Sequence, residues 1–170
     1  MFQIKDVVVY GSQGVCEITG IETRKIDGEV KTYFVLCPKS DKGTTCYVPT
    51  WNEKAWSKMR RVMTKKEVDA LIDSMPERKP NWVANEAERR ETYRGILAGG
   101  DPAAIVSMVQ ALFLYKKERE AQGKRLNMSD EHFMKDAERI LYNEWQYVLE
   151  VDKNGLMEYI FRRIEKINNP

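Results

Sequence analysis

The chain has 170 residues, 42% of them apolar and 32% charged, a composition typical of a folded soluble protein and not of a disordered one. It has no long uncharged apolar run and no basic-then-apolar leader, which argues against membrane insertion and secretion. The net charge is only +2, and basic and acidic residues nearly balance in residues 1–63, 64–100 and 101–170 alike. We therefore expect weak binding to free DNA at physiological salt, so that a nucleic-acid role would need a partner that holds the protein in place.

Residues 6–62 have the pattern of a small β domain. An apolar run at residues 7–10 and a longer alternating segment at residues 15–26 are typical of strands. The pair Asp27-Gly28 predicts a tight hairpin, because a type I′ turn needs a positive φ at both central residues. Further strands are expected at residues 31–37, 44–48 and 60–62. Short strands at this spacing favour a strongly bent barrel of the SH3 or Tudor kind.

After residue 63 the apolar period becomes helical, so the predicted fold class is α+β. The small N-terminal barrel, residues 1–62, is followed by a compact all-α bundle, residues 63–170. Thr64 and Glu67 have the spacing of a capping box that begins the first helix. Further helix starts are expected at the caps Asn81, Asp101 and Ser129, and near Gly155. Short joints between these helices imply antiparallel neighbours.

Trp82 stands at the predicted start of the second helix, where the chain passes from one part of the bundle to the next. At about 100° per residue, one helix side would carry Trp82, Arg89 and Tyr93, with Arg90 at its edge and Arg94 beyond it. In one interpretation Trp82 is the first residue of a stripe that faces the core. In the other it is an exposed indole that stacks on bases or wedges between them while the arginines bind phosphates. The periodicity leaves both open.

No catalytic constellation is visible in the sequence. His132, the only histidine, is expected to be a solvated residue at a helix start and not a general base. Cys16, Cys37 and Cys46 have no C-x-x-C spacing and no neighbouring histidine, as expected for reduced thiols in the cytoplasm. We therefore expect no enzymatic activity, no cofactor and no metal.

The β domain offers a better candidate, a contact surface for another protein. Arg24 and Lys25 lie on one predicted strand, and Tyr47 and Trp51 lie on and after another. An edge strand can add to a partner's sheet through main-chain hydrogen bonds, and these side chains would flank such a contact. The alternative is that Trp51 packs with Trp56 between the two halves of the chain.

Several segments carry a family resemblance: VYGSQGV at 9–15, IETR at 21–24, YFVL at 33–36, YVP at 47–49, and Trp82 with its following arginines and Gly99-Gly100-Asp101. With them the chain resembles the CarD/CdnL bacterial transcription regulators. Its N-terminal part also resembles the RNA-polymerase-interacting module of the transcription-repair coupling factor. The resemblance implies that the barrel binds the β subunit of RNA polymerase by edge-strand pairing. It also implies that a tryptophan of the helical domain wedges into the minor groove of promoter DNA at the upstream edge of the melted bubble.

Within this resemblance Trp82 corresponds to the wedge, Arg89 and Arg90 to the arginines that follow it, and Arg24 to a polymerase-facing basic residue. The predicted DNA-binding residues are thus Trp82, Arg89, Arg90 and Arg94, and the predicted polymerase-binding residues are Arg24, Lys25, Tyr47 and Trp51. The chain departs from the family at two places. Tyr47 stands where members often carry arginine, and the span from Trp82 to Asp101 is longer by about one helical turn.

We therefore expect a cytoplasmic, monomeric transcription regulator that binds RNA polymerase and stabilises the promoter open complex without reading DNA sequence. The alternative is a polymerase-bound adaptor whose helical domain binds another protein, in which case Trp82 would be buried. An enzyme of another kind would need a deep polar pocket with strongly shifted titrating groups, and the residue inventory offers little to build one.

Overall fold

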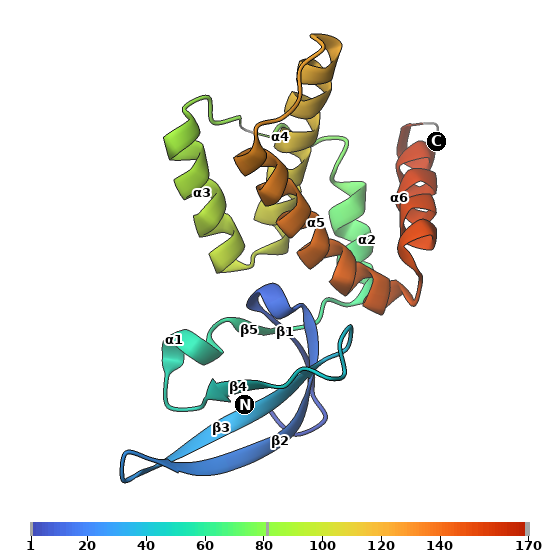
Figure 1. The fold of residues 1–170 in the computed structure, drawn as a ribbon. Coiled ribbons are helices and arrows are strands. Elements are labelled where there is room, and N and C mark those ends of the chain that lie inside the picture. Colours follow the sequence, from blue (N-terminus) through green and yellow to red (C-terminus); the bar gives the residue numbers. More distant parts are fainter. Residues whose placement is uncertain (1, 81, 169–170) are drawn as a thin grey trace. The chain divides into compact units, whose positions relative to one another are not determined.

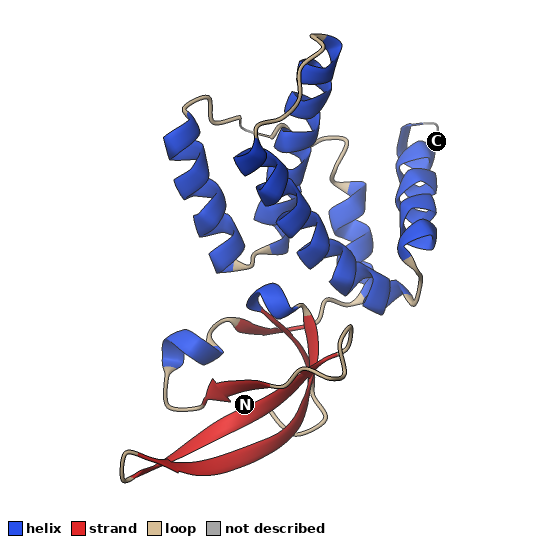
Figure 2. Ribbon diagram, viewed as in Figure 1, coloured by secondary structure: helices blue, strands red, loops and turns tan. Residues whose placement is uncertain are grey.

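The computed structural model of the protein describes residues 2–80 and 82–168. The chain divides into two compact units (Figure 1), residues 1–62 and residues 63–170, which are described separately below as unit 1 and unit 2. Unit 1 is mainly strands and unit 2 is helices (Figure 2). The predicted α+β class is confirmed.

The described residues of unit 1, 2–62, form one antiparallel sheet of five strands. In spatial order they are β4, Cys46–Pro49; β3, Glu29–Pro38; β2, Val15–Ile26; β1, Val7–Tyr10; and β5, Met59–Arg61. Two short helical turns, η1 (Gly11–Gln13) and α1 (Glu53–Trp56), join them. In the described part of the chain β4 and β5 are the two ends of this order and do not pair, so the sheet is open and the predicted barrel is better called a bent sheet.

The longest strands, β2 and β3, form the hairpin that Asp27-Gly28 predicts. Both turn residues have positive φ, 52° for Asp27 and 81° for Gly28, as a type I′ turn requires. The pairing runs from Ile26 with Glu29 to Cys16 with Pro38, and it is interrupted by a bulge between Ile18 and Gly20. Because a bulge bends and twists the strand that carries it, this one helps to curve the sheet.

One face of the sheet holds the core of unit 1. The buried residues of this core cluster are Val8, Cys16, Ile18, Leu36, Val48 and Met59. Burial raises the pKa of the Cys16 thiol to about 12, so at neutral pH this side chain is an apolar core group and not a nucleophile.

Within residues 63–80 and 82–168, unit 2 contains five helices. They are α2 (Lys65–Asp73), α3 (Glu86–Gly99), α4 (Pro102–Ala121), α5 (Met128–Leu149) and α6 (Lys153–Asn168). Their apolar faces meet in one core, which includes Val68, Tyr93, Leu112, Leu141 and Trp145. Among the described residues, none of the helices has the length and apolar character needed to cross a bilayer.

Two helix starts follow the sequence prediction. Thr64 and Glu67 form the reciprocal capping box of α2. Asp101 caps α4 by accepting hydrogen bonds from the amides of Ala103 and Ala104. In both cases a short polar side chain next to an apolar helix stripe predicted the cap correctly.

The starts of α3 and α5 differ from the prediction. Helix α3 begins at Glu86, and its cap is Asn85, whose side chain accepts a hydrogen bond from the amide of Glu88. The predicted cap Asn81 lies outside the described residues. Helix α5 is capped by Asn127 and not by Ser129. For α3 the reason is tertiary, because the carbonyl groups of Val83 and Ala84 accept hydrogen bonds from an arginine instead of from helical amides.

Candidate functional site

The outer hairpin of unit 1 brings aromatic and charged side chains to one face of the sheet. Cross-strand partners share a face, and here the partners are Arg24 with Lys31, Glu22 with Tyr33, and Val35 with Tyr47. We call Arg24, Tyr33, Tyr47 and Trp51 the aromatic patch. The patch lies opposite the face that carries Leu36 and Val48, since side chains alternate along a strand.

The four side chains of the aromatic patch contact one another. The guanidinium carbon of Arg24 lies 3.8 Å from the ring centre of Tyr47. The Tyr33 ring meets Trp51 edge to face with ring centres 4.8 Å apart. Glu22 accepts a hydrogen bond from Arg24 at 2.9 Å, which raises the pKa of Arg24. Tyr47 and Trp51 nevertheless remain 40% and 50% exposed, so the patch is an organised but accessible surface.

Lys25 lies outside this patch. Its cross-strand partner is Val30, and Val30 is exposed. Because Lys25 directly follows Arg24 in a regular strand, its side chain points to the opposite face. The structure therefore brings together Arg24, Tyr47 and Trp51 of the predicted contact residues and leaves Lys25 apart from them.

The edge of the sheet next to the patch is strand β4. Within the described residues its strand partner is β3, so one side of its backbone faces away from the sheet. Tyr47 lies within this edge strand, and Pro49 at its end offers no amide for pairing. An added strand would thus pair with the part of β4 beside Tyr47.

In unit 2, Trp82 precedes α3 and packs partly into the helical core. Its indole stacks on the ring of Tyr115 in α4, with ring centres 3.9 Å apart and planes inclined by 25°. The guanidinium carbon of Arg89 lies 4.4 Å from the centre of the same indole. Trp82 is half-buried. It is thus neither fully in the core nor fully exposed, and it is intermediate between the two predicted alternatives.

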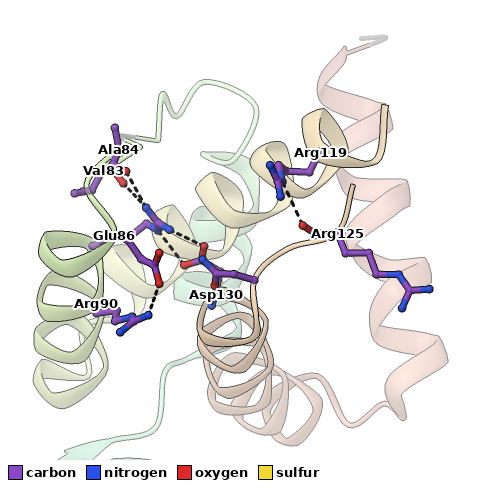
Figure 3. A network of polar contacts seen from close by, with 9 residues as sticks. Val83, Ala84, Glu86, Arg90, Arg119, Arg125 and Asp130 are labelled. Atoms are coloured by element: carbon purple, nitrogen blue, oxygen red, sulfur yellow. Dashed lines mark hydrogen bonds and ion pairs between the residues drawn. The ribbon is translucent and has the colours of Figure 1, made fainter. Parts of the chain in front are cut away.

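Arg89 is buried, contrary to the expectation of an exposed cation beside the indole. Its Nε and Nη2 donate to the two carboxylate oxygens of Asp130 at 2.9 and 2.7 Å. Its Nη1 donates to the carbonyl oxygens of Val83 and Ala84 at 2.9 and 3.2 Å. Figure 3 shows these two carbonyl groups and Asp130 converging on one point between α3 and α5. With its donors engaged in this way, Arg89 does not offer its guanidinium to a phosphate from outside.

Arg90 and Arg94 do face solvent. Arg90 forms an ion pair with Glu86 one turn earlier in α3 (Figure 3), and Arg94 forms one with Glu91 at 2.6 Å. Exposed pairs of this kind are weak and exchange readily with other anions. These two arginines therefore keep the accessibility that the sequence-based hypothesis requires, on the solvent side of the helix that follows Trp82.

One comparison with known proteins bears on unit 1. Residues 2–63 match the family described as the CarD-like/TRCF RID domain. Unit 1 is therefore similar to the CarD-like/TRCF RID domain, and it is called the RID domain below. Members of this domain family interact with RNA polymerase, and the protein is accordingly a transcription-related protein that carries a polymerase-interacting domain. The match ends at residue 63, so the helices of unit 2 lie outside it.

The match covers every element of the sheet, from β1 to β5, and therefore includes the aromatic patch of the RID domain. The resemblance seen in the sequence at residues 9–15, 21–24, 33–36 and 47–49 is confirmed for this domain.

We call Trp82, Arg89, Tyr115 and Asp130 the Trp82 site. Sequence reasoning missed two of these residues, Tyr115 and Asp130. Tyr115 lies within the long helix α4 and gives no local signal. Asp130 lies in the first turn of α5, where an acidic side chain is normally solvated and interacts with the helix dipole, whereas here it is fully buried. The pair of Arg89 and Asp130 is separated by 41 residues, so only the packing of α3 against α5 reveals it.

Proposed function

We propose that the protein is a non-enzymatic transcription regulator that binds the β subunit of RNA polymerase through its RID domain and stabilises the promoter open complex through Trp82 of unit 2. The single observation that carries the proposal is the RID domain match at residues 2–63. The proposal places the protein in the cytoplasm, with RNA polymerase and promoter DNA as its partners. It adds the β subunit, the DNA contact and the role of Trp82 to what the match itself supports.

The aromatic patch and the edge of β4 are the proposed polymerase contact. Exposed tyrosine and tryptophan side chains are the residue types that most often dominate binding energy at protein interfaces. Here they lie beside a strand edge that can accept a further strand. Arg24, held over Tyr47, adds a positive group that can pair with a carboxylate of the partner.

Binding to polymerase can compensate for the weak affinity of unit 2 for free DNA. The helical unit is close to neutral, so release of counterions gives it little affinity for free DNA. Tethering raises the local concentration of the unit near promoter DNA to the order of millimolar. A weak and sequence-independent contact then suffices.

Trp82 is the proposed contact with DNA, supported by Arg90 and Arg94 on the adjoining helix. Insertion of an apolar side chain between base steps costs a few kcal/mol of stacking, and this cost is lowest where the duplex is already opening. The edge of the melted bubble is therefore favoured over ordinary duplex. Stabilisation of the open complex by about 1.4 kcal/mol would slow its collapse roughly tenfold if the barrier top is unchanged.

A second candidate is a polymerase-bound adaptor whose helical unit binds another protein. The observation in its favour is the exposure of large apolar side chains on unit 2, among them Leu114 on α4 and Phe161 on α6. In this case Trp82 would serve the fold alone, through its stack on Tyr115.

The deciding experiment measures open-complex lifetime after a competitor challenge, with polymerase holoenzyme, promoter DNA and the full-length protein. We expect Trp82→Ala to shorten the lifetime by about tenfold while polymerase affinity stays unchanged. Phe161→Ala is the matched control, because it removes an exposed aromatic ring from the same unit away from Trp82. An unchanged lifetime with folded Trp82→Ala would reject the DNA role and support the adaptor, and loss of lifetime with both variants would show that unit 2 acts through a wider surface.

A further inference from the structure

We propose that Asp130 and Arg89 are positioning residues for Trp82, and that they hold the indole ready for its contact with melting DNA. This inference rests on the proposed function of Trp82. It assigns a role to the buried ion pair of Arg89 and Asp130. This pair lies outside the RID domain and does not include the exposed arginines of α3.

Every donor bond described for Arg89 is directed at one of two targets. The first is the Asp130 carboxylate, and both side chains of this pair are nearly inaccessible, with 4% and 1% of their surface exposed. The second is the main chain of Val83 and Ala84, the two residues that follow Trp82. A planar guanidinium can satisfy both targets together because its donors lie in a rigid fork.

The same guanidinium also lies over the Trp82 indole, 4.4 Å from the ring centre. Arg89 thus touches the tryptophan in two ways, directly through the ring and indirectly through the two carbonyl groups that follow it in the chain. Tyr115 supplies another contact by stacking on the indole. We call Asp130, Arg89, Val83 and Ala84 the Trp82 clamp.

Asp130 in turn is fixed by the start of α5. Its backbone amide donates to the side chain of the cap residue Asn127 at 2.7 Å. Hydrogen bonding to Asp130 raises the pKa of Arg89, so the guanidinium of Arg89 stays protonated. Trp82 is therefore held in place by contacts that lead to α5, a helix of 22 residues. Its position does not depend only on the short extended segment that carries it.

A buried ion pair is a poor device for stability alone. Because removing two charges from water is costly, well-packed apolar residues of similar volume are often as stable or more so. The clamp does what apolar residues do not, since it fixes two carbonyl groups and a ring face at once. The positioning of Trp82 explains better than stability why a charged pair occupies this buried place.

The consequence is that Trp82 meets DNA with its conformation already set. Ordering one side chain on binding commonly lowers the binding constant by about threefold to tenfold. A clamp that orders the indole beforehand saves this factor in the open complex. Loss of the clamp should therefore shorten the lifetime by about threefold to tenfold, without any effect on polymerase binding.

Arg89→Lys is the first test variant, because it keeps the charge but loses the fork that serves Asp130 and both carbonyl groups together. Arg163→Lys is the matched control. Arg163 forms a similar two-bond pair with Asp73, at 2.6 and 2.8 Å, between α6 and α2 of the same unit. We expect Arg89→Lys to shorten open-complex lifetime by about threefold to tenfold and Arg163→Lys to leave it unchanged.

The same measurement in a Trp82→Ala background separates positioning from a general effect on the fold. We expect Arg89→Lys to have no further effect once the indole is absent. An equal effect with and without Trp82 would overturn the proposal, as would a full lifetime for folded Arg89→Lys. If Trp82→Ala itself leaves the lifetime unchanged, the proposed function fails; if Trp82→Ala shortens it and Arg89→Lys does not, the clamp alone is rejected.

A second variant covers the case in which Arg89→Lys does not fold. The double substitution Arg89→Met with Asp130→Leu removes both buried charges together, an exchange that many proteins tolerate. It also removes the bonds to Val83 and Ala84. We expect the same loss of lifetime as for Arg89→Lys, and an unchanged lifetime for the folded double variant would overturn the proposal.

Discussion

The aromatic patch of unit 1 and the Trp82 site of unit 2 are built from the same kinds of residue, an arginine on an aromatic ring and a carboxylate that holds the arginine. In unit 1, Arg24 and Glu22 pair at 2.9 Å with side chains 44% and 47% exposed. In unit 2, Arg89 and Asp130 pair at 2.7 Å with side chains 4% and 1% exposed. The distances are alike and the burial is opposite.

This difference in burial implies different roles for Arg24 and Arg89. An exposed pair contributes little to stability and remains free to exchange its partner, which suits a binding surface. A buried pair is costly to break because the remaining charge has no water to solvate it. Arg24 is thus available to a partner, whereas Arg89 serves the internal geometry of its own unit.

The largest expected effect tests this contrast directly. Arg89→Ala leaves the Asp130 carboxylate buried without its partner and should lower the free energy of unfolding of unit 2 by about 3 to 5 kcal/mol. Chemical denaturation followed by far-ultraviolet circular dichroism, which the helices of unit 2 dominate, measures the change. Arg24→Ala is the counterpart in unit 1 and should leave the unfolding curve of the protein unchanged. Equal effects of the two substitutions would show that burial does not separate them.

The next effect concerns polymerase affinity. Trp51→Ala removes an exposed ring of the aromatic patch and should weaken binding to RNA polymerase by roughly fivefold to thirtyfold, because truncating an important interface residue costs about 1 to 2 kcal/mol. Lys25→Ala is the control, because Lys25 lies one residue from Arg24 but on the other face of the sheet. Binding can be measured by surface-immobilised polymerase and titrated protein. Equal weakening by both substitutions would indicate that the partner covers both faces of the hairpin.

A smaller effect is expected where α3 ends beyond the Trp82 site. Gly100 caps this helix with φ of 68°, a conformation that an L-residue adopts at a cost of roughly 1 to 2 kcal/mol. Gly100→Ala should lower the free energy of unfolding of unit 2 by that amount. Gly99→Ala is the matched control, because a Cβ atom at Gly99 meets nothing within 4 Å and its φ is ordinary. Thermal unfolding of both variants measures the two effects. A larger loss of stability for Gly99→Ala than for Gly100→Ala would contradict the assignment of Gly100 as the cap.

The smallest expected effect is at the first helix of unit 2. Thr64→Ala removes the capping box of α2 and should cost about 1 kcal/mol of stability. Thr92→Ala is a suitable control, since the Thr92 hydroxyl bonds within the helix to the Glu88 carbonyl oxygen and serves no helix end. Denaturation of both variants measures the difference, and equal stability would show that water replaces the cap at no cost.

Much of the architecture was determined by the sequence alone. The Asp27-Gly28 turn, the Thr64 capping box and the start of α4 at Asp101 all follow from bonds within a few residues, which local sequence encodes. The separation of Arg24 from Lys25 follows from the alternation of side chains along a strand, although both residues were predicted to belong to one contact surface. The family of unit 1 was visible in its glycine-punctuated strands.

Only the tertiary structure decided the character of the Trp82 site. Periodicity placed Trp82 and Arg89 on one side of a single helix, but Trp82 precedes the helix and Arg89 turns inward to Asp130. A guanidinium on a mixed helix face has the same local pattern whether it meets water or a buried carboxylate 41 residues away. That choice depends on how α3 packs against α5, because the energy of a charge is set by what surrounds it and not by its neighbours in the chain.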